Sequence, residues 1–229
     1  MQQGLFGGEE GRHRPLAARM RPRNLDEYVG QSHLVGEGKP LRAAVLENQL
    51  HSMILWGPPG VGKTTFARML AEQTSVVFET LSAVASGVKD IRSAVETARQ
   101  RRETSGQDTM LFVDEVHRFN KSQQDAFLHH VESGLITLIG ATTENPSFEV
   151  ISALLSRCQV ISLSALSESD IERLLTRAVT DAENGLGGTE LMLSDAALAH
   201  IASISDGDGR AALNALEIAA STTRSAGRT

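Results

Sequence analysis

Five short apolar segments set the strongest limit on how this chain can fold. They lie at residues 52–56 (SMILW), 76–80 (VVFET), 109–114 (TMLFVD), 135–142 (LITLIGAT) and 158–163 (CQVISL). Longer stretches with helical periodicity separate them, notably at residues 63–74, 88–102 and 121–132. Strands that are apolar along most of their length and that alternate with helices indicate a parallel sheet covered on both faces. We therefore predict an α/β fold with a five-stranded parallel sheet.

The pattern changes near residue 163, where the strand candidates stop. Three helical patterns follow, at residues 167–184, 194–205 and 209–222, and the first two open with a serine that an acidic residue follows closely. Residues 1–14 are rich in Gly, Gln and charge without any periodicity. We predict a flexible tail at residues 1–14, the α/β domain at residues 15–163 and a small helical domain at residues 164–229.

Composition limits the class of protein further. With 229 residues, of which 41% are hydrophobic, the chain can form one large or two modest domains. No apolar run approaches the roughly 18 residues of a membrane span, and the N-terminus lacks the apolar core of a signal peptide. The single cysteine, Cys158, cannot form an internal disulfide and fits a reducing compartment. We predict a cytoplasmic protein with Cys158 packed as a small apolar residue, and the net charge of −6 argues against indiscriminate coating of nucleic acid.

The clearest chemical motif is GPPGVGKTT, which follows the first strand candidate and precedes the first long helix. It fits the pattern G-x-x-x-x-G-K-[ST] of a phosphate-binding loop. Glycines let backbone N–H groups approach a phosphate, and the helix N-terminus adds its positive end. The alternative is a glycine turn between strand and helix. We predict a nucleoside triphosphate site with these contacts: Gly57, Pro58, Pro59, Gly60, Val61, Gly62, Lys63, Thr64 and Thr65.

Two carboxylates follow the third strand candidate, in the stretch MLFVDEVHRF. Parallel α/β folds gather their ligands at the carboxyl edge of the sheet. Asp114 is therefore predicted to join the Thr64 hydroxyl in the shell of a Mg²⁺ ion, and Glu115 to orient and deprotonate a water. Alone, the pair reads equally well as helix N-terminal acids, but downstream of a phosphate loop it favours an ATPase.

The order of motifs GPPGVGKTT, LFVDEVHRF, IGATTENP, LLSRC and GDGRAALN resembles the AAA+ ATPases. More specifically, residues 16–42 and the stretch from Asp114 to Val150 are similar to the replication-associated recombination protein A group, which is related to the Werner-helicase-interacting ATPase and to clamp-loader ATPases. The resemblance extends from about Leu16 to Asn214. It implies a P-loop AAA+ domain followed by a small helical lid, with ATP and Mg²⁺ bound.

The resemblance also implies roles for individual residues. Thr143 matches the sensor that helps hold the water near the γ-phosphate, although a threonine at a strand end is the plainer interpretation. Arg210 matches a second sensor on the lid, and the alternative is a surface arginine at a helix N-terminus. Tyr28, Val29 and Gly30, in the stretch EYVGQ, match the segment that packs on adenine.

Arg157 stands directly before the last strand candidate, with no acidic residue within five positions. In the AAA+ pattern this is the arginine finger, which reaches the γ-phosphate held by a neighbouring subunit. We expect it to be unpaired within its own subunit. A helix C-terminal arginine favoured by the dipole is the competing interpretation.

The partners expected from the resemblance are single-stranded or junction DNA, a single-strand-binding protein and further copies of the same chain. The run from Arg12 to Arg23 holds five arginines and no acid, which fits either a solvated stretch or phosphate contact. Gln2 to Phe6 fits a Q-x-x-L-F peptide that docks on the sliding clamp. Members of the group continue for about a further domain, so we interpret the chain as the ATPase module plus lid of a nucleoid-associated bacterial protein.

Three functions remain open from the sequence. The first is a DNA-dependent ATPase acting at replication forks or strand junctions in recombination and repair. The second is a clamp-loader or Holliday-junction branch-migration subunit, which would share every core motif. The third is a nucleotide-dependent adaptor in which binding rather than hydrolysis matters.

Overall fold

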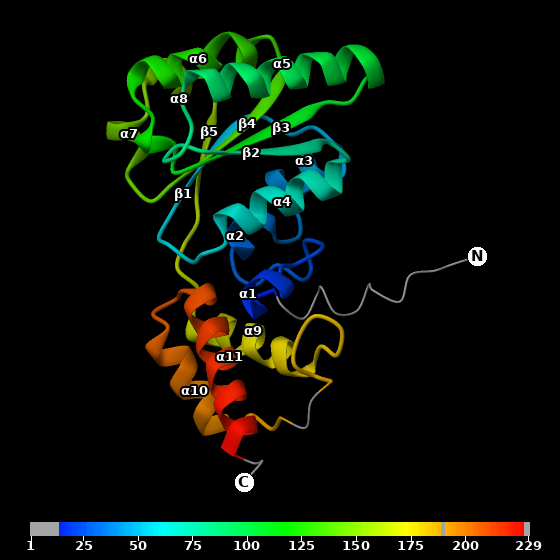
Figure 1. The fold of residues 1–229 in the computed structure, drawn as a ribbon, viewed down its shortest axis with the longest axis vertical. Helices are drawn as coiled ribbons and strands as arrows, with labels where there is room; N and C mark the ends of the chain where they lie inside the picture. Colours follow the sequence, from blue (N-terminus) through cyan, green and yellow to red (C-terminus); the bar gives the residue numbers. More distant parts are fainter. Residues whose placement is uncertain (1–13, 189–190, 227–229) are drawn as a thin grey trace, which may run out of the picture. The chain divides into compact units, whose positions relative to one another are not determined.

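The structure is a computed structural model that describes residues 14–188 and 191–226. The described residues form two compact units, Arg23–Ser164 and a helical unit that joins residues 14–22 to the chain from Ala165 onward. Figure 1 shows the chain from end to end. Each unit has its own core, so each is described by itself.

The first unit is built on a five-stranded sheet with the order β2-β3-β4-β1-β5. All four strand pairs are parallel. The strands are β1 (Met53–Trp56), β2 (Val77–Ser82), β3 (Thr109–Asp114), β4 (Ile136–Thr142) and β5 (Gln159–Ser162). The predicted α/β class and five-stranded parallel sheet are therefore confirmed, and the main change in bounds is that β2 continues two residues past Thr80.

Helices cover both faces of this sheet, as Figure 1 shows. Helix α4 (Lys63–Thr74) packs on one face, and α5 (Val88–Ser105) and α6 (Lys121–Glu132) pack on the other. Successive residues of a strand point to opposite faces, and in β3 the side chains of Met110 and Phe112 join the α4 side while Leu111 and Val113 join the α5–α6 side. Burial on both faces explains why the inner strands β1, β3 and β4 are apolar without alternation, whereas β2 and β5 at the sides of the sheet are mostly half-buried or exposed.

Shorter elements complete the first unit. They are α2 (Ser32–Val35) and α3 (Pro40–Leu46) before the sheet, the 3-10 helix η1 (Val116–Arg118) after β3, and α7 (Pro146–Glu149) and α8 (Ser152–Leu155) between β4 and β5. The register sets Trp56 of β1 beside Thr142 of β4 and beside Ser162 of β5. The ends of these strands therefore meet at one edge of the sheet.

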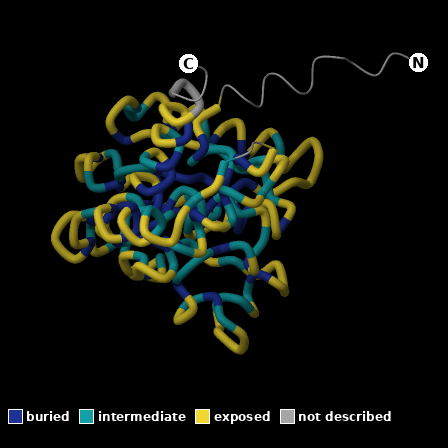
Figure 2. Tube along the Cα trace, turned by 90° about the horizontal axis from the view of Figure 1, so that it is seen from below, coloured by how far each residue is buried: buried dark blue, intermediate teal, exposed yellow. Residues whose placement is uncertain are grey.

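The helical unit contains α9 (Glu168–Thr180), α10 (Asp195–Ile204) and α11 (Gly209–Ala226), together with the short α1 (Leu16–Arg19). Side-chain oxygens of Ser167 and Ser194 accept hydrogen bonds from backbone N–H groups in the first turns of α9 and α10. Buried residues, dark blue in Figure 2, include the apolar cluster that these helices share. The sequence patterns therefore identified all three long helices of this unit.

Residues 14–22 pack with the helical unit, whereas the sequence prediction placed residues from 15 onward in the α/β domain. Leu16 and Met20 are buried in the apolar cluster of α9, α10 and α11. The Leu16 N–H donates to both carboxylate oxygens of Glu217, at 3.0 and 3.1 Å, and Arg19 donates to the Gly185 carbonyl at 3.1 Å. Arg19 is thus neither freely solvated nor available for phosphate contact in this conformation.

None of the described helices combines the length and the apolar character needed to cross a membrane.

Candidate functional site

The phosphate loop leaves the carboxyl end of β1 and enters α4. A Cβ atom at Gly57 would lie 2.3 Å from the Leu163 carbonyl oxygen, so only glycine fits where the loop passes the end of β5. The Gly57 N–H donates to the Thr142 carbonyl at 3.2 Å, which ties the start of the loop to the end of β4. Gly60 and Gly62 have φ angles of 72° and 94°, in the left-handed region that glycine adopts without strain.

The first turn of α4 is open to an anion. Its N-cap is Gly62, and no side chain caps it. The buried Lys63 ammonium donates to the carbonyl oxygens of Gly57 and Pro58, each at 2.7 Å, which holds the lysine against the loop. Helix N–H groups without a capping side chain, together with a lysine held over the loop, are the donors that a phosphate chain requires. The geometry of residues 57–65 therefore fits the predicted phosphate contacts.

Tyr28 lies against this loop. Its ring packs on Phe66 with centroids 5.2 Å apart, and a Cβ atom at Gly62 would lie 3.2 Å from the Tyr28 hydroxyl oxygen. The hydroxyl is buried without a hydrogen-bond partner among the described residues, and burial raises the pKa of Tyr28 above its ordinary value. Val29 and Gly30 are half-buried beside it. The three predicted base contacts thus follow one another next to the phosphate loop, and their contact with adenine stays a prediction.

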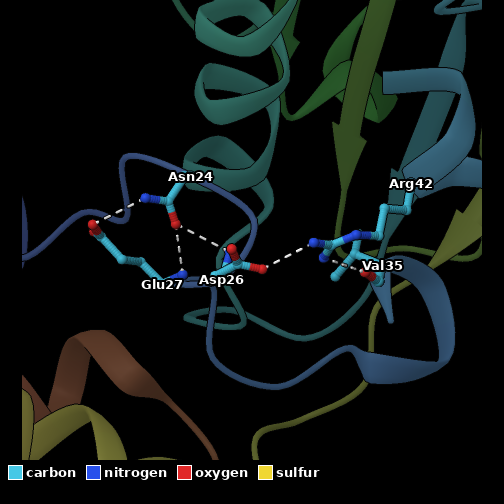
Figure 3. A network of polar contacts seen from close by, with 5 residues as sticks. All are labelled: Asn24, Asp26, Glu27, Val35 and Arg42. Carbon is cyan, nitrogen blue, oxygen red and sulfur yellow. Dashed lines mark hydrogen bonds and ion pairs between the residues drawn. The ribbon is translucent and has the colours of Figure 1, made fainter. Parts of the chain in front are cut away.

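A polar network fixes the turn that leads to Tyr28 (Figure 3). The Asn24 side-chain oxygen accepts from the backbone N–H groups of Asp26 and Glu27, at 3.1 and 2.9 Å. Arg42 of α3 donates to the Asp26 carboxylate at 2.9 Å and to the Val35 carbonyl at 3.2 Å. The network joins the segment before Tyr28 to α2 and α3 and so fixes the backbone conformation of that segment.

Gln31, directly after Gly30, clamps the last residue of the α/β unit. Its side-chain amide donates to the Ser164 carbonyl at 2.7 Å and accepts from the Ser164 N–H at 3.0 Å. Gln31 is buried and has a φ angle of 56°, an uncommon conformation for a residue with a side chain. Gln31 was not among the predicted site residues, although it belongs to the stretch EYVGQ.

Asp114 ends β3, and Glu115 follows it at the carboxyl edge of the sheet. Both are half-buried. Glu115 has φ and ψ angles of 54° and 47°, a left-handed conformation that is strained for a residue with a Cβ. This conformation turns the chain sharply into η1. Strain of this kind concentrates at functional sites, which agrees with the predicted role of Glu115.

Thr142 ends β4, and the predicted sensor Thr143 is the next residue, half-buried. The fully buried Thr142 hydroxyl accepts from the Glu144 N–H at 3.0 Å and lies 2.9 Å from Nδ1 of His117. The plainer interpretation of a threonine that satisfies a strand end therefore applies to Thr142. Thr143 has no such contact among the described residues.

Arg157 is paired within its own subunit, so the expectation that it is unpaired is wrong. Its guanidinium donates to the Glu132 carboxylate at 3.1 Å and to the Ala153 carbonyl at 2.8 Å. The Glu132 partner ends α6, which is distant in sequence and invisible to a local search for acids. The Glu132 side chain is 64% exposed and that of Arg157 is 33% exposed, and solvent-accessible pairs contribute at most about 1 kcal/mol, so the arginine can exchange this partner for another.

Arg157 and the phosphate loop lie at opposite ends of the parallel strands: Arg157 at the amino ends and the phosphate loop at the carboxyl ends. Arg157 stands two residues before β5, whose first residue Gln159 pairs with Met53, the first residue of β1. The phosphate loop follows Trp56, the last residue of the four-residue β1. A strand rises about 3.3 Å per residue, so the two edges are about 10 Å apart along β1.

Arg210 lies in the first turn of α11, exposed, in the helical unit. The Asp208 carboxylate accepts from the N–H groups of Arg210 and Ala211, at 2.8 and 2.9 Å, and so caps the helix. The structure places Arg210 in a different unit from the phosphate loop. Its role as a sensor stays a prediction.

Two polar residues, the buried Gln124 and the half-buried His117, support the site and were not predicted from the sequence. The Gln124 side chain donates to the carbonyls of Phe119 and Glu149 and accepts from the Ile151 N–H, so it joins the end of η1 to the segment before α8. His117 contacts Thr142 and Glu115. Single polar residues carry no sequence signal for such contacts, because most of the partners, such as Thr142 for His117 and the backbone of residues 149 and 151 for Gln124, are distant in the sequence.

The residues present fit ATP with a magnesium ion. Thr64 is the second residue of α4, after Lys63, and Asp114 ends β3, which β4 separates from β1 at the same edge of the sheet. Mg²⁺ is usually held by one or two protein oxygens together with the substrate phosphates, so Thr64 and Asp114 are a sufficient protein contribution. A strand–loop–helix phosphate site combined with Asp114 and Glu115 at the end of β3 defines the class of P-loop nucleotide-binding proteins.

Comparison with known proteins narrows this class. Residues 53–166 match the family model "ATPase family associated with various cellular activities (AAA)". The replication-associated recombination protein A of Escherichia coli is 59% identical over 206 residues, which are 90% of this chain and 46% of that protein. The protein "ATPase WRNIP1" of Dictyostelium discoideum is 44% identical over 206 residues, which are 90% of this chain and 23% of that protein.

Among solved structures, the RuvB Holliday junction branch migration motor of Thermotoga maritima superposes with a TM-score of 0.69 and 30% identity, covering 85% of this chain and 63% of that one. The chain belongs to the AAA+ ATPases, in the group of replication-associated recombination protein A. It spans about half the length of the bacterial relatives of that group that it matches.

Proposed function

We propose that this chain is the ATP-hydrolysing module of a DNA-dependent ATPase that acts at replication forks or strand junctions in recombination and repair. The observation that carries the proposal is the meeting of the phosphate loop, Asp114, Glu115 and the end of β4 at one edge of the sheet. The names of the relatives support the part of the proposal that concerns replication and recombination.

The proposed chemistry divides among four groups of the α/β unit. Lys63 and the first N–H groups of α4 hold the β- and γ-phosphates, while Thr64 and Asp114 hold the Mg²⁺ ion, which neutralises charge on the phosphate oxygens. Glu115 orients and deprotonates the attacking water. Thr143, the residue after the end of β4, is proposed to contact the same water or the γ-phosphate.

Arg157 is proposed to act on the γ-phosphate of a neighbouring copy. Its place at the amino edge of the sheet, opposite the phosphate loop of its own subunit, supports action in trans. A guanidinium added there stabilises the charge that develops on the transferred phosphoryl group. Activity then requires a homo-oligomer, and the Arg157–Glu132 pair is the resting contact that assembly replaces. Arg210 is proposed to report the γ-phosphate from the helical unit.

A second candidate function is branch migration of four-way junctions or clamp loading. The structural likeness to the Holliday junction branch migration motor favours it. The two candidates differ in product, because the first requires only ATP turnover stimulated by DNA, whereas the second requires a moved junction or a loaded clamp. A nucleotide-dependent adaptor is the third, and it predicts activity in the cell without hydrolysis.

The test is ATP turnover by the protein alone, measured with single-stranded, forked and duplex DNA. We expect stimulation that is greatest with forked or single-stranded DNA and absent in the Glu115→Gln protein, which should still bind ATP. Movement of a synthetic four-way junction would select the second candidate. Full complementation in cells by Glu115→Gln would select the adaptor.

Further partners and the location are proposals from the same group. Docking on a sliding clamp through Gln2 to Phe6 concerns residues outside those that the structure describes. A clamp pull-down that is unchanged when Leu5 and Phe6 are replaced by Ala would remove that proposal. Contact with a single-strand-binding protein and a cytoplasmic, nucleoid-associated location are tested by co-purification and by imaging of the tagged protein.

A further inference from the structure

His117 stands between Glu115 and the end of β4. Its Nδ1 atom lies 2.9 Å from the Thr142 hydroxyl oxygen and 3.4 Å from a carboxylate oxygen of Glu115. The His117 side chain is 9% exposed and Thr142 is fully buried, so water is excluded from the contact between them, whereas the Glu115 side chain is 34% exposed. Thr142 also accepts the N–H of Gly57 through its carbonyl, which makes it a neighbour of the phosphate loop.

The hydrogen-bond pattern assigns the tautomer of His117. The Thr142 hydroxyl donates to the Glu144 carbonyl at 3.2 Å and accepts from the Glu144 N–H at 3.0 Å, which leaves one lone pair for His117. An Nδ1 lone pair would also face the Glu115 carboxylate unfavourably. His117 therefore donates from Nδ1 to the threonine oxygen, and the Glu115 carboxylate lies 3.4 Å from the same atom, at ion-pair distance.

The fold has a specific reason to bring η1 onto β4 at this point. A Cβ atom at Gly140 would lie 3.2 Å from the side chain of Val116 and 2.8 Å from that of Ile54. Glycine at this position of β4 lets the buried Val116 pack closely on the sheet. The left-handed Glu115 turns the chain so that His117, two residues later, contacts Thr142 at the end of β4.

We propose that His117 is a positioning residue for ATP hydrolysis, which holds the Glu115 carboxylate in register with the end of β4 through its Nδ1–H group. This inference rests on the proposed function, because it assumes that Glu115 acts on the attacking water. Through these contacts of His117, the position of the Glu115 carboxylate depends on the end of β4, which lies next to Thr143 and the phosphate loop. The role assigned to His117 is to place Glu115, not to contact the nucleotide or the attacking water.

The test compares three substitutions of His117 in the full chain. Asparagine places an amide N–H where Nδ1 stands, glutamine places one where Nε2 stands, and alanine places none. We expect His117→Ala and His117→Gln to lower kcat by about 10- to 100-fold, the size of effect that misplacement by 1 Å produces. His117→Asn should recover most of that loss. The KM and the Kd for ATP should change by no more than about twofold, because ground-state binding is untouched.

Two further variants separate positioning from folding. Thr142→Ser keeps the acceptor and should keep kcat, whereas Thr142→Val removes it and should lower kcat as His117→Ala does. His51→Asn, the same change at an exposed histidine of the same unit, is the matched control and should leave kcat unchanged. In a Glu115→Gln background, His117→Ala should lower the residual rate no further, because both changes remove the same function.

Equal loss with Asn and Gln, or a fall in ATP affinity that parallels the fall in kcat, would overturn the inference. So would normal turnover by His117→Ala. A wild-type protein without any ATP turnover would overturn the proposed function as well, whereas wild-type turnover that is indifferent to His117 would overturn only the inference.

Discussion

Replacement of Gln124 by methionine tests whether the turn after Glu115 and the segment before Arg157 are held as one piece. Gln124 is 2% exposed, and its amide makes three hydrogen bonds, at 2.9 Å to the Phe119 carbonyl, 3.0 Å to the Glu149 carbonyl and 2.9 Å from the Ile151 N–H. Methionine has a similar length, so the change removes these bonds and leaves only a small change in packing. Three backbone groups then lose their partner.

The expected magnitude follows from those three bonds. At about 1 kcal/mol each, their loss lowers the free energy of unfolding of the α/β unit by about 3 kcal/mol. For a chain of this size this corresponds to a fall in Tm of about 6 to 12 °C. Urea denaturation and calorimetry measure both quantities. The control is Gln100→Met on the exposed face of α5, where we expect a change of less than about 0.5 kcal/mol.

The functional consequence is measured in the same protein. Gln124 lies between η1, which begins directly after Glu115, and α8, which ends two residues before Arg157. Its loss should therefore reduce the dependence of turnover on protein concentration as well as kcat. A Gln124→Met protein with the wild-type unfolding free energy, within about 0.5 kcal/mol, would refute the reasoning that these buried bonds are stabilising.

Three further predictions concern single groups. Tyr28→Phe removes a buried hydroxyl without a partner, so the nucleotide-free protein should gain about 1 kcal/mol in unfolding free energy by urea titration, and a loss would contradict the burial argument. Arg157→Ala should change the unfolding free energy by less than about 1 kcal/mol, since its pair with Glu132 is exposed, yet abolish concentration-dependent turnover. Burial raises the pKa of the Cys158 thiol to about 11, so the thiolate is scarce at pH 8. Alkylation by iodoacetamide should therefore be slow until the pH rises towards that value. Rapid labelling of the folded protein at pH 8 would contradict this prediction.

The sequence was sufficient for the elements that depend on local pattern. Helices α4 and α6 begin and end at the predicted residues, because a glycine loop precedes α4 and Asn120 caps α6 with Gln123 three residues later. The phosphate loop was also readable, since its glycines are required by contacts within a few residues and by the passage beside Leu163.

The features that escaped the sequence depend on contacts between distant residues. Glu132 pairs with Arg157 across 25 positions, and Leu16 joins a cluster formed mainly by residues beyond 165. His117 was quoted within its motif but given no role, because its function depends on the position of Thr142 and hence on Gly140. Apolar periodicity predicts which residues are buried, whereas the partner of a single polar side chain follows only from the assembled sheet.

The most direct test of the account mixes two inactive proteins. If the site is completed in trans, Glu115→Gln supplies Arg157 to a neighbour, and Arg157→Ala supplies an intact Glu115. ATP turnover of an equimolar mixture with forked DNA should then rise to about one quarter of the wild-type rate, the share of interfaces that combine both groups in a head-to-tail assembly. A mixture no more active than its two components measured separately would contradict the assignment of Glu115 and Arg157 to one shared site.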